Sequence, residues 1–140
     1  SEEAFRRVDH DYVVRAAELA TGQGAEQFLL VSAVGADPQS QIFYNRVKGE
    51  TEAAVKRLPF RATWVLRPSL LLGDRAELRI GERLASAVSR PLSPLMVGRF
   101  RRYRPIAAVD VARVMVVLAH RHGTGGVLES HEITAIAHAD

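Results

Sequence analysis

The segment FLLVSAVGADPQSQIFYNRVK, residues 28–48, decides the fold because it passes from a strand through a loop into a helix. Residues 28–31 form a short, continuous apolar run, which predicts a strand buried on both faces, as in parallel sheets. A proline and polar side chains then predict a loop over residues 35–41. Apolar side chains recur at helical spacing over residues 43–58, just before another proline, and predict a helix there.

The same alternation of strand and helix continues on both sides of this segment. A helix is expected over residues 2–20, and a second buried strand over residues 62–66. The remaining expected elements are a helix over 75–88, an irregular excursion over 91–104, a helix opened by Asp110, a strand over 127–129 and a small C-terminal helix. Strands that alternate with helices of this length indicate right-handed crossovers, so the sequence predicts an α/β fold with a parallel sheet.

The composition is that of a globular protein, with 47% apolar and 25% charged residues. No apolar run approaches the roughly 20 residues that cross a bilayer, so no membrane partner is expected. Cysteine is absent, which excludes disulfides and thiolate chemistry and leads us to expect a cytoplasmic location. A net charge of +3 is a weak argument for nucleic acid, which is not expected as a partner.

Tyr44 and Lys48 stand one helical turn apart, so their side chains project from the same face of the expected helix. A free tyrosine, with a pKa near ~10, is a poor acid or base at neutral pH, and a nearby cation favours its deprotonated form. The chain has 19 Lys and Arg residues, and only two of them are lysines, so a lysine at this position is notable. The pair is either a proton-transfer couple or a surface pair without a role.

Ser32 follows the expected strand directly and precedes Tyr44 by twelve positions. Ligands of open parallel sheets bind in the crevice outside the carboxyl ends of the strands. A serine there is suited to donate a hydrogen bond to a substrate carbonyl, although serines at such places also serve turns and caps. Together, Ser32, Tyr44 and Lys48 are the candidate catalytic residues.

This combination resembles the short-chain dehydrogenase/reductase superfamily, and the wider match is to its atypical branch of proteins like the Tat-interactive protein. The stretches that carry the resemblance are Val8-Asp9, Leu29 to Ser32, Gly35 to Asp37, YNRVKGE at 44–50, Arg67 to Ser69, Gly73 to Arg75 and Val127 to Glu129. The resemblance implies a Rossmann-type doubly wound parallel sheet flanked by helices, and a cofactor that is NAD or NADP, with NADP slightly favoured. It also implies a cofactor-dependent oxidoreductase acting on a small carbonyl or alcohol.

The resemblance assigns a role to each candidate residue. Tyr44 becomes the general acid/base, Lys48 holds the nicotinamide ribose and favours deprotonation of Tyr44, and Ser32 polarises the carbonyl. These three residues also contact the cofactor, and the resemblance places three more beside the nicotinamide, namely Pro68, Ser69 and Leu70. Arg67 is expected in a structural ion pair, and the role of Asp9, where many relatives carry Asn, is open.

The chain departs from the family in its dinucleotide-binding part. It contains no G-x-x-G-x-x-G turn for the pyrophosphate, and the first four strands of the family's usual sheet are absent. We therefore expect residues 1–140 to be the C-terminal half of one NAD(P)-binding domain whose N-terminal, Gly-rich half is absent. Alone, the chain is expected to be inactive and to dimerise or aggregate through its unpaired strand edge. A homodimer through the helices over 2–20 and 41–58 is implied by resemblance only. The alternative function is a non-catalytic, dinucleotide-binding regulator that acts through protein partners.

The densest positive charge lies at Arg99, Arg101, Arg102 and Arg104, around Phe100 and Tyr103. Two interpretations stay open for this basic stretch. It is either a solvated loop, as charge runs usually are, or a lid that attracts an anionic substrate or a phosphate.

Overall fold

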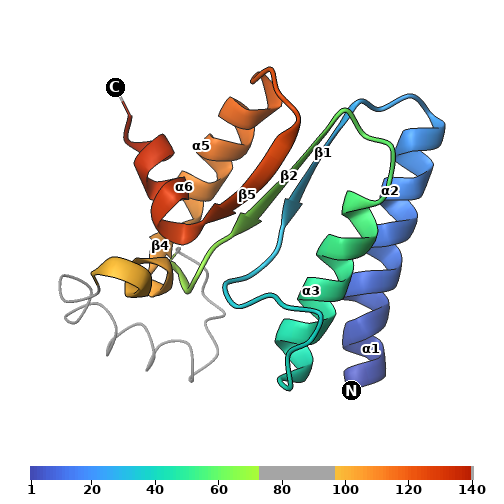
Figure 1. Cartoon of the computed structure of the whole chain (residues 1–140), viewed down its shortest axis with the longest axis horizontal. Helices are drawn as coiled ribbons and strands as arrows, with labels where there is room; N and C mark the ends of the chain where they lie inside the picture. The colour runs from blue at the N-terminus through green and yellow to red at the C-terminus, as the bar shows by residue number, and fades with distance from the viewer. Residues whose placement is uncertain (73–96, 140) are drawn as a thin grey trace.

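The computed structural model describes residues 1–72 and 97–139, and its centre is a three-stranded parallel sheet (Figure 1). The strands are β1 (Gln27–Val31), β2 (Ala62–Arg67) and β5 (Gly125–Glu129), in the order β1-β2-β5. Both pairings are parallel, and β2 lies between its two neighbours. The α/β class and the parallel sheet flanked by helices, expected from the sequence, are confirmed.

Helices cover both faces of this sheet (Figure 1). A continuous N-terminal helical segment and α3 cover one face, and α5 and α6 cover the other. The helical elements are α1 (Glu2–Arg6), the π-helical turn η1 (Arg7–Asp11), α2 (Tyr12–Gly22), α3 (Phe43–Lys56), α5 (Ala108–Ala119) and α6 (Ser130–Ala137). Within the described ranges, no helix is both long and apolar enough to traverse a bilayer.

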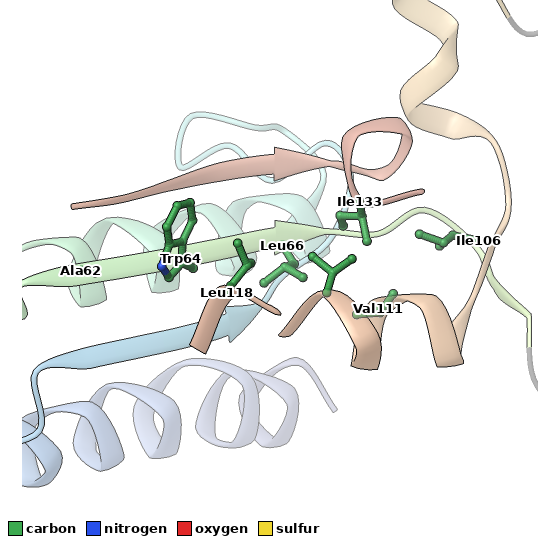
Figure 2. Close-up of a cluster of buried hydrophobic side chains, with 8 residues drawn as sticks. Ala62, Trp64, Leu66, Ile106, Val111, Leu118 and Ile133 are labelled. Carbon is green, nitrogen blue, oxygen red and sulfur yellow. The ribbon is translucent and has the colours of Figure 1, made fainter. Parts of the chain in front are cut away.

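Neighbouring strand residues point to opposite faces, so the core has two parts. On the side of α5 and α6, Trp64 and Leu66 of β2 pack in the larger cluster, part of which is drawn in Figure 2. On the side of α2 and α3, Val65 packs with Leu30 of β1. The larger cluster consists of Ala62, Trp64, Leu66, Ile106, Val111, Val114, Leu118 and Ile133. Because both faces are covered, the strands are apolar without strict alternation, as the run at residues 28–31 predicts.

Several expected boundaries differ slightly in the structure, and two features were not predicted. The short parallel sheet of β3 (Leu71–Leu72) and β4 (Ile106–Ala107) was missed, as was the 3-10 helix η3 (Gly98–Tyr103) inside the excursion. The helix that Asp110 was expected to open begins two positions earlier, at Ala108. The helix expected over 75–88 lies outside the described residues.

Strand β1 has only one strand neighbour, β2, within the part of the chain that the structure describes. Its last residue, Val31, is partly exposed, and so are Val8, Tyr12 and Leu19 on the N-terminal helical segment. Association through this strand edge, or dimerisation through the N-terminal helices and α3, stays a prediction.

Gly49 allows the loop after β1 to lie against α3. A Cβ on Gly49 would stand 2.3 Å from the backbone carbonyl carbon of Asp37 and from the backbone nitrogen of Pro38. In an exposed helix, Gly→Ala stabilises by about 1 kcal/mol. Here we expect the opposite sign, because overpacking against backbone costs about 1–3 kcal/mol.

Gly49→Ala is therefore expected to lower the free energy of unfolding, measured by urea denaturation. The matched control is Gly22→Ala, since no atom lies within 4 Å of a Cβ built there. A Gly49→Ala variant as stable as the parent chain would show that the loop is not held against α3 in solution.

Candidate functional site

Ser32 lies immediately after β1, at the carboxyl end of the strand. Its backbone N–H donates to the carbonyl of Leu66 at 2.8 Å, which continues the pairing of β1 with β2. The Ser32 hydroxyl is buried and has no hydrogen-bond partner among residues 1–72 and 97–139. Buried polar groups are nearly always paired, so an unpaired hydroxyl at this edge suits a group that bonds to a ligand.

Tyr44 lies in the first turn of α3 and is 44% exposed. Its ring packs against Phe5 of α1, with centroids 5.3 Å apart and planes at 43°. Phe5 also contacts Phe43 edge-on, with centroids 6.0 Å apart. The aromatic contacts therefore hold the ring of Tyr44 from the side of α1.

Lys48 follows one turn later, and its Nζ lies 5.8 Å from the centroid of the Tyr44 ring. The structure thus brings Tyr44 and Lys48 together on one face of α3, as their spacing predicts. The Lys48 ammonium also donates to Asp9 Oδ1 at 2.5 Å, and the lysine side chain is only 15% exposed. The sequence left the role of Asp9 open, and the structure shows that its carboxylate pairs with Lys48.

Asp9 belongs to the π-helical turn η1, which also bonds to α3 through its backbone. The Thr51 hydroxyl donates to the Asp9 carbonyl at 2.9 Å and to the Val47 carbonyl at 2.8 Å. Single π-helical turns inside α-helices occur frequently at functional sites. No local sequence signal predicts this turn, so spacing alone did not place Asp9 beside Lys48.

The loop between β1 and α3 folds back onto the start of the helix. The Asp37 N–H donates to the carbonyl of Asn45 at 3.0 Å. Gly35 has a φ of +79°, which a glycine adopts without strain, and a Cβ there would lie 3.1 Å from the Asn45 amide nitrogen. The carboxyl end of β1 and the amino end of α3 consequently lie toward the same end of the molecule (Figure 1). Convergence of Ser32 with the Tyr44–Lys48 pair stays a prediction.

Pro68, Ser69 and Leu70 follow β2 at the same edge of the sheet. The carbonyl of Pro68, a buried residue, accepts from the Val34 N–H at 3.1 Å, so this stretch lies beside the residues that follow β1. The Ser69 hydroxyl donates to the backbone carbonyl of Arg104, and the Leu70 carbonyl accepts from the Ile106 N–H at 3.0 Å. The stretch is therefore fixed between the end of β1 and the segment before α5, and its contact with a nicotinamide stays a prediction.

Arg67 forms the structural ion pair that the sequence predicted. Its Nη2 lies 2.6 Å from Glu52 Oε2, its Nε lies 2.9 Å from Glu52 Oε1, and its Nη1 lies 3.2 Å from Glu129 Oε1. The hydrogen bonds to Glu52 raise the pKa of Arg67 above its ordinary value, even though burial opposes the charge. The guanidinium thus joins β2 to α3 and to β5.

Within residues 1–72 and 97–139, no three His, Asp or Glu side chains gather in a way that would hold a metal ion. His10, beside Asp9, instead bonds to its neighbour Asp11, with Nδ1 and Oδ1 2.8 Å apart.

Comparison with known proteins finds relatives but no matching family model. The chain is 51% identical to Protein HTATIP2 of Rattus norvegicus over 83 residues, which is 59% of the chain and 34% of that protein. It is 35% identical to Protein FMP52, mitochondrial, of Coccidioides immitis over 113 residues, which is 81% of the chain and 46% of the relative. With FMP52 of Debaryomyces hansenii it shares 33% identity over 127 residues, which is 89% of the chain and 54% of the relative.

These names correct one expectation. The absence of cysteine led us to expect a cytoplasmic location, and this expectation is wrong. The FMP52 relatives from several fungi are named as mitochondrial proteins. Cysteine usage reports on redox environment only, and a reducing compartment need not be the cytoplasm. The chain spans about a third to just over half of the length of these relatives, and over most of its own length it is similar to HTATIP2 and FMP52 proteins.

Proposed function

We propose that this chain carries the catalytic end of an NAD(P)-dependent oxidoreductase of the short-chain dehydrogenase/reductase type. The observation that carries the proposal is the Tyr44–Lys48 pair, one helical turn apart, with the ammonium 5.8 Å from the phenol ring. The buried, unpartnered hydroxyl of Ser32 at the carboxyl end of β1 supports it. The similarity to HTATIP2 and FMP52 supports an NAD(P)-binding protein of this kind.

The residues present fit the nicotinamide end of a dinucleotide. An ammonium group has three N–H donors, and the bond to Asp9 uses one of those of Lys48. The remaining donors suit ribose hydroxyls, while Asp9 holds the lysine in place. We propose that the stretch from Pro68 to Leu70 borders the nicotinamide ring, because it lies beside the residues that follow β1.

The proposed reaction is the reduction of a carbonyl to an alcohol, and its reverse. When bound, the cofactor supplies a hydride to the carbonyl carbon. The Tyr44 hydroxyl donates its proton to the carbonyl oxygen, so that the C=O double bond becomes C–O–H and the phenolate remains on Tyr44. The Ser32 hydroxyl donates a hydrogen bond to the same oxygen and stabilises the charge that develops there. The Lys48 ammonium stabilises the phenolate.

One observation favours a second candidate, a dinucleotide-binding regulator without turnover. The Asp9 carboxylate lies 2.5 Å from the Lys48 ammonium and opposes its charge, which weakens the stabilisation of a phenolate on Tyr44. Such a protein would bind NADH or NADPH and respond to the dinucleotide through a protein partner. In a protein that also carries a Gly-rich, dinucleotide-binding half, dinucleotide binding by calorimetry, without oxidation of NADPH by any of a broad panel of aldehydes and ketones, would favour this candidate. The kinetic measurements on variants use the same longer protein, because residues 1–140 alone are expected to be inactive.

Lys48→Ala tests the catalytic proposal. Loss of hydrogen bonds from a charged group is expected to lower kcat/KM about 10- to 100-fold and to raise KM for the dinucleotide. The measurement is NADPH oxidation at 340 nm with the best aldehyde of the panel. The matched control is Lys56→Ala, which removes the other lysine of α3, where Nζ lies 3.7 Å from Glu52. Equal kinetic constants in Lys48→Ala and the parent protein would contradict the assignment.

A further inference from the structure

The 3-10 helix η3 is fixed to the carboxyl edge of the main sheet. The backbone carbonyl of Arg104, the residue after η3, accepts hydrogen bonds from the hydroxyls of Ser69 and Ser130. Ser69 follows β2 and Ser130 follows β5, so two strand ends hold this one carbonyl. In Figure 1, η3 correspondingly lies at the end of the sheet toward which the strands point.

The side chains on this segment are strongly basic. Arg101 and Arg102 are exposed, and the Arg102 guanidinium lies over the ring of Tyr103, 5.1 Å from its centroid. The Nε of Arg104 is buried and has no hydrogen-bond partner among the residues that the structure describes. Within the described parts of the chain, none of these three arginines forms an ion pair with a carboxylate.

The acidic residues at the start of α6 form bonds with residues outside η3, although Glu129 Oε2 is buried and has no hydrogen-bond partner among the described residues. Glu129 Oε1 lies 3.2 Å from Arg67 Nη1, and Glu132 Oε2 accepts from the Glu129 N–H in a capping box at 2.8 Å. The positive charge of η3 therefore stays uncompensated by these two carboxylates. A solvated loop would need neither the two hydroxyl anchors nor a buried, unpaired guanidinium nitrogen.

We infer that Arg101, Arg102 and Arg104 form a recognition site for a carboxylate or phosphate group of the substrate. The inference rests on the proposed function, because it takes the substrate carbonyl to lie near Tyr44 and the nicotinamide to lie beside Ser69. Ser69 bonds directly to the Arg104 carbonyl, which fixes the backbone that carries the arginines beside the stretch proposed to border the nicotinamide. Guanidinium groups suit planar, bidentate anions, and a carbonyl compound with a carboxylate or phosphate fits this placement.

The test compares carbonyl compounds that differ only in charge. The probes are three pairs of an acid and its methyl ester, namely 4-carboxybenzaldehyde, succinic semialdehyde and pyruvate with their esters. Binding is measured by calorimetry and turnover by NADPH oxidation, for the parent protein and for Arg101→Gln/Arg102→Gln. The control is Arg57→Gln/Arg121→Gln, which removes the same charge from exposed positions after α3 and α5, away from η3.

In at least one pair, the acid is expected to bind about 10- to 100-fold more tightly than the ester, and only the Arg101/Arg102 variant is expected to lose this preference. Equal binding of acid and ester in all pairs, or a preference that survives in that variant, overturns the inference. An Arg101/Arg102 variant that loses affinity for NADPH instead also overturns it, because the anion would then belong to the dinucleotide.

The two proposals fail in different ways. A preference for the acid that depends on Arg101 and Arg102, without turnover of any pair, supports the anion site and contradicts the oxidoreductase. Turnover of both acid and ester with equal kcat/KM supports the oxidoreductase and contradicts the anion site.

Discussion

Tyr44→Phe, in a protein that also carries a Gly-rich, dinucleotide-binding half, is expected to lower the rate of NADPH-dependent carbonyl reduction about 100- to 10,000-fold, since that is the usual contribution of a positioned general acid. The substitution removes only the hydroxyl that would deliver the proton. The ring keeps its contact with Phe5 at 5.3 Å, and the residue is 44% exposed, so the loss of the hydroxyl leaves the packing in place. We therefore expect the melting temperature, measured by circular dichroism, to stay unchanged.

The matched control for this variant is Tyr12→Phe. Tyr12 lies at the start of α2 and is 61% exposed. The substitution Tyr12→Phe removes the same hydroxyl group from a different helix. We expect Tyr12→Phe to keep the parent kcat. If Tyr44→Phe also keeps the parent kcat, Tyr44 is not the proton donor, and the non-catalytic regulator becomes the better account of this chain.

The sequence predicted those parts of the candidate site that local spacing controls. Tyr44 and Lys48 meet because residues four apart share a helix face, and Ser32 lies at a strand end because the apolar run stops there. The contact between Asp9 and Lys48 was not predicted. It joins positions 39 residues apart and depends on a π-helical turn that has no local sequence signature. Long-range contacts of this kind follow from packing and not from spacing.

The fold likewise contains elements that local sequence patterns predict and elements that they do not. The apolar runs at β1 and β2 are long enough to be distinctive, and both form strands of the main sheet. The two-residue strands β3 and β4 are too short to show any periodicity, and they pair only because Leu71 and Ile106 are brought together in three dimensions. The anchoring of η3 by Ser69 and Ser130 likewise needed the strand ends to be adjacent.

Arg67→Ala is expected to reduce the free energy of unfolding by about 3–5 kcal/mol, the usual cost of removing one partner of a buried ion pair. The Glu52 side chain is 3% exposed, and two of its contacts, at 2.6 and 2.9 Å, are to Arg67. Without Arg67, the cation left beside this carboxylate in the described part of the chain would be Lys56, with Nζ at 3.7 Å. The measurement is urea unfolding followed by circular dichroism.

An exposed ion pair provides the comparison for this variant. Arg6 pairs with Glu50, and their side chains are 42% and 29% exposed, so Arg6→Ala is expected to cost less than about 1 kcal/mol. If Arg67→Ala does not fold, the free energy of unfolding is measured for Arg67→Met/Glu52→Gln instead. Replacing both partners removes the unpaired buried charge and should restore much of the stability. A cost for Arg67→Ala no larger than that for Arg6→Ala would mean that the guanidinium does not hold β2 to α3 and β5.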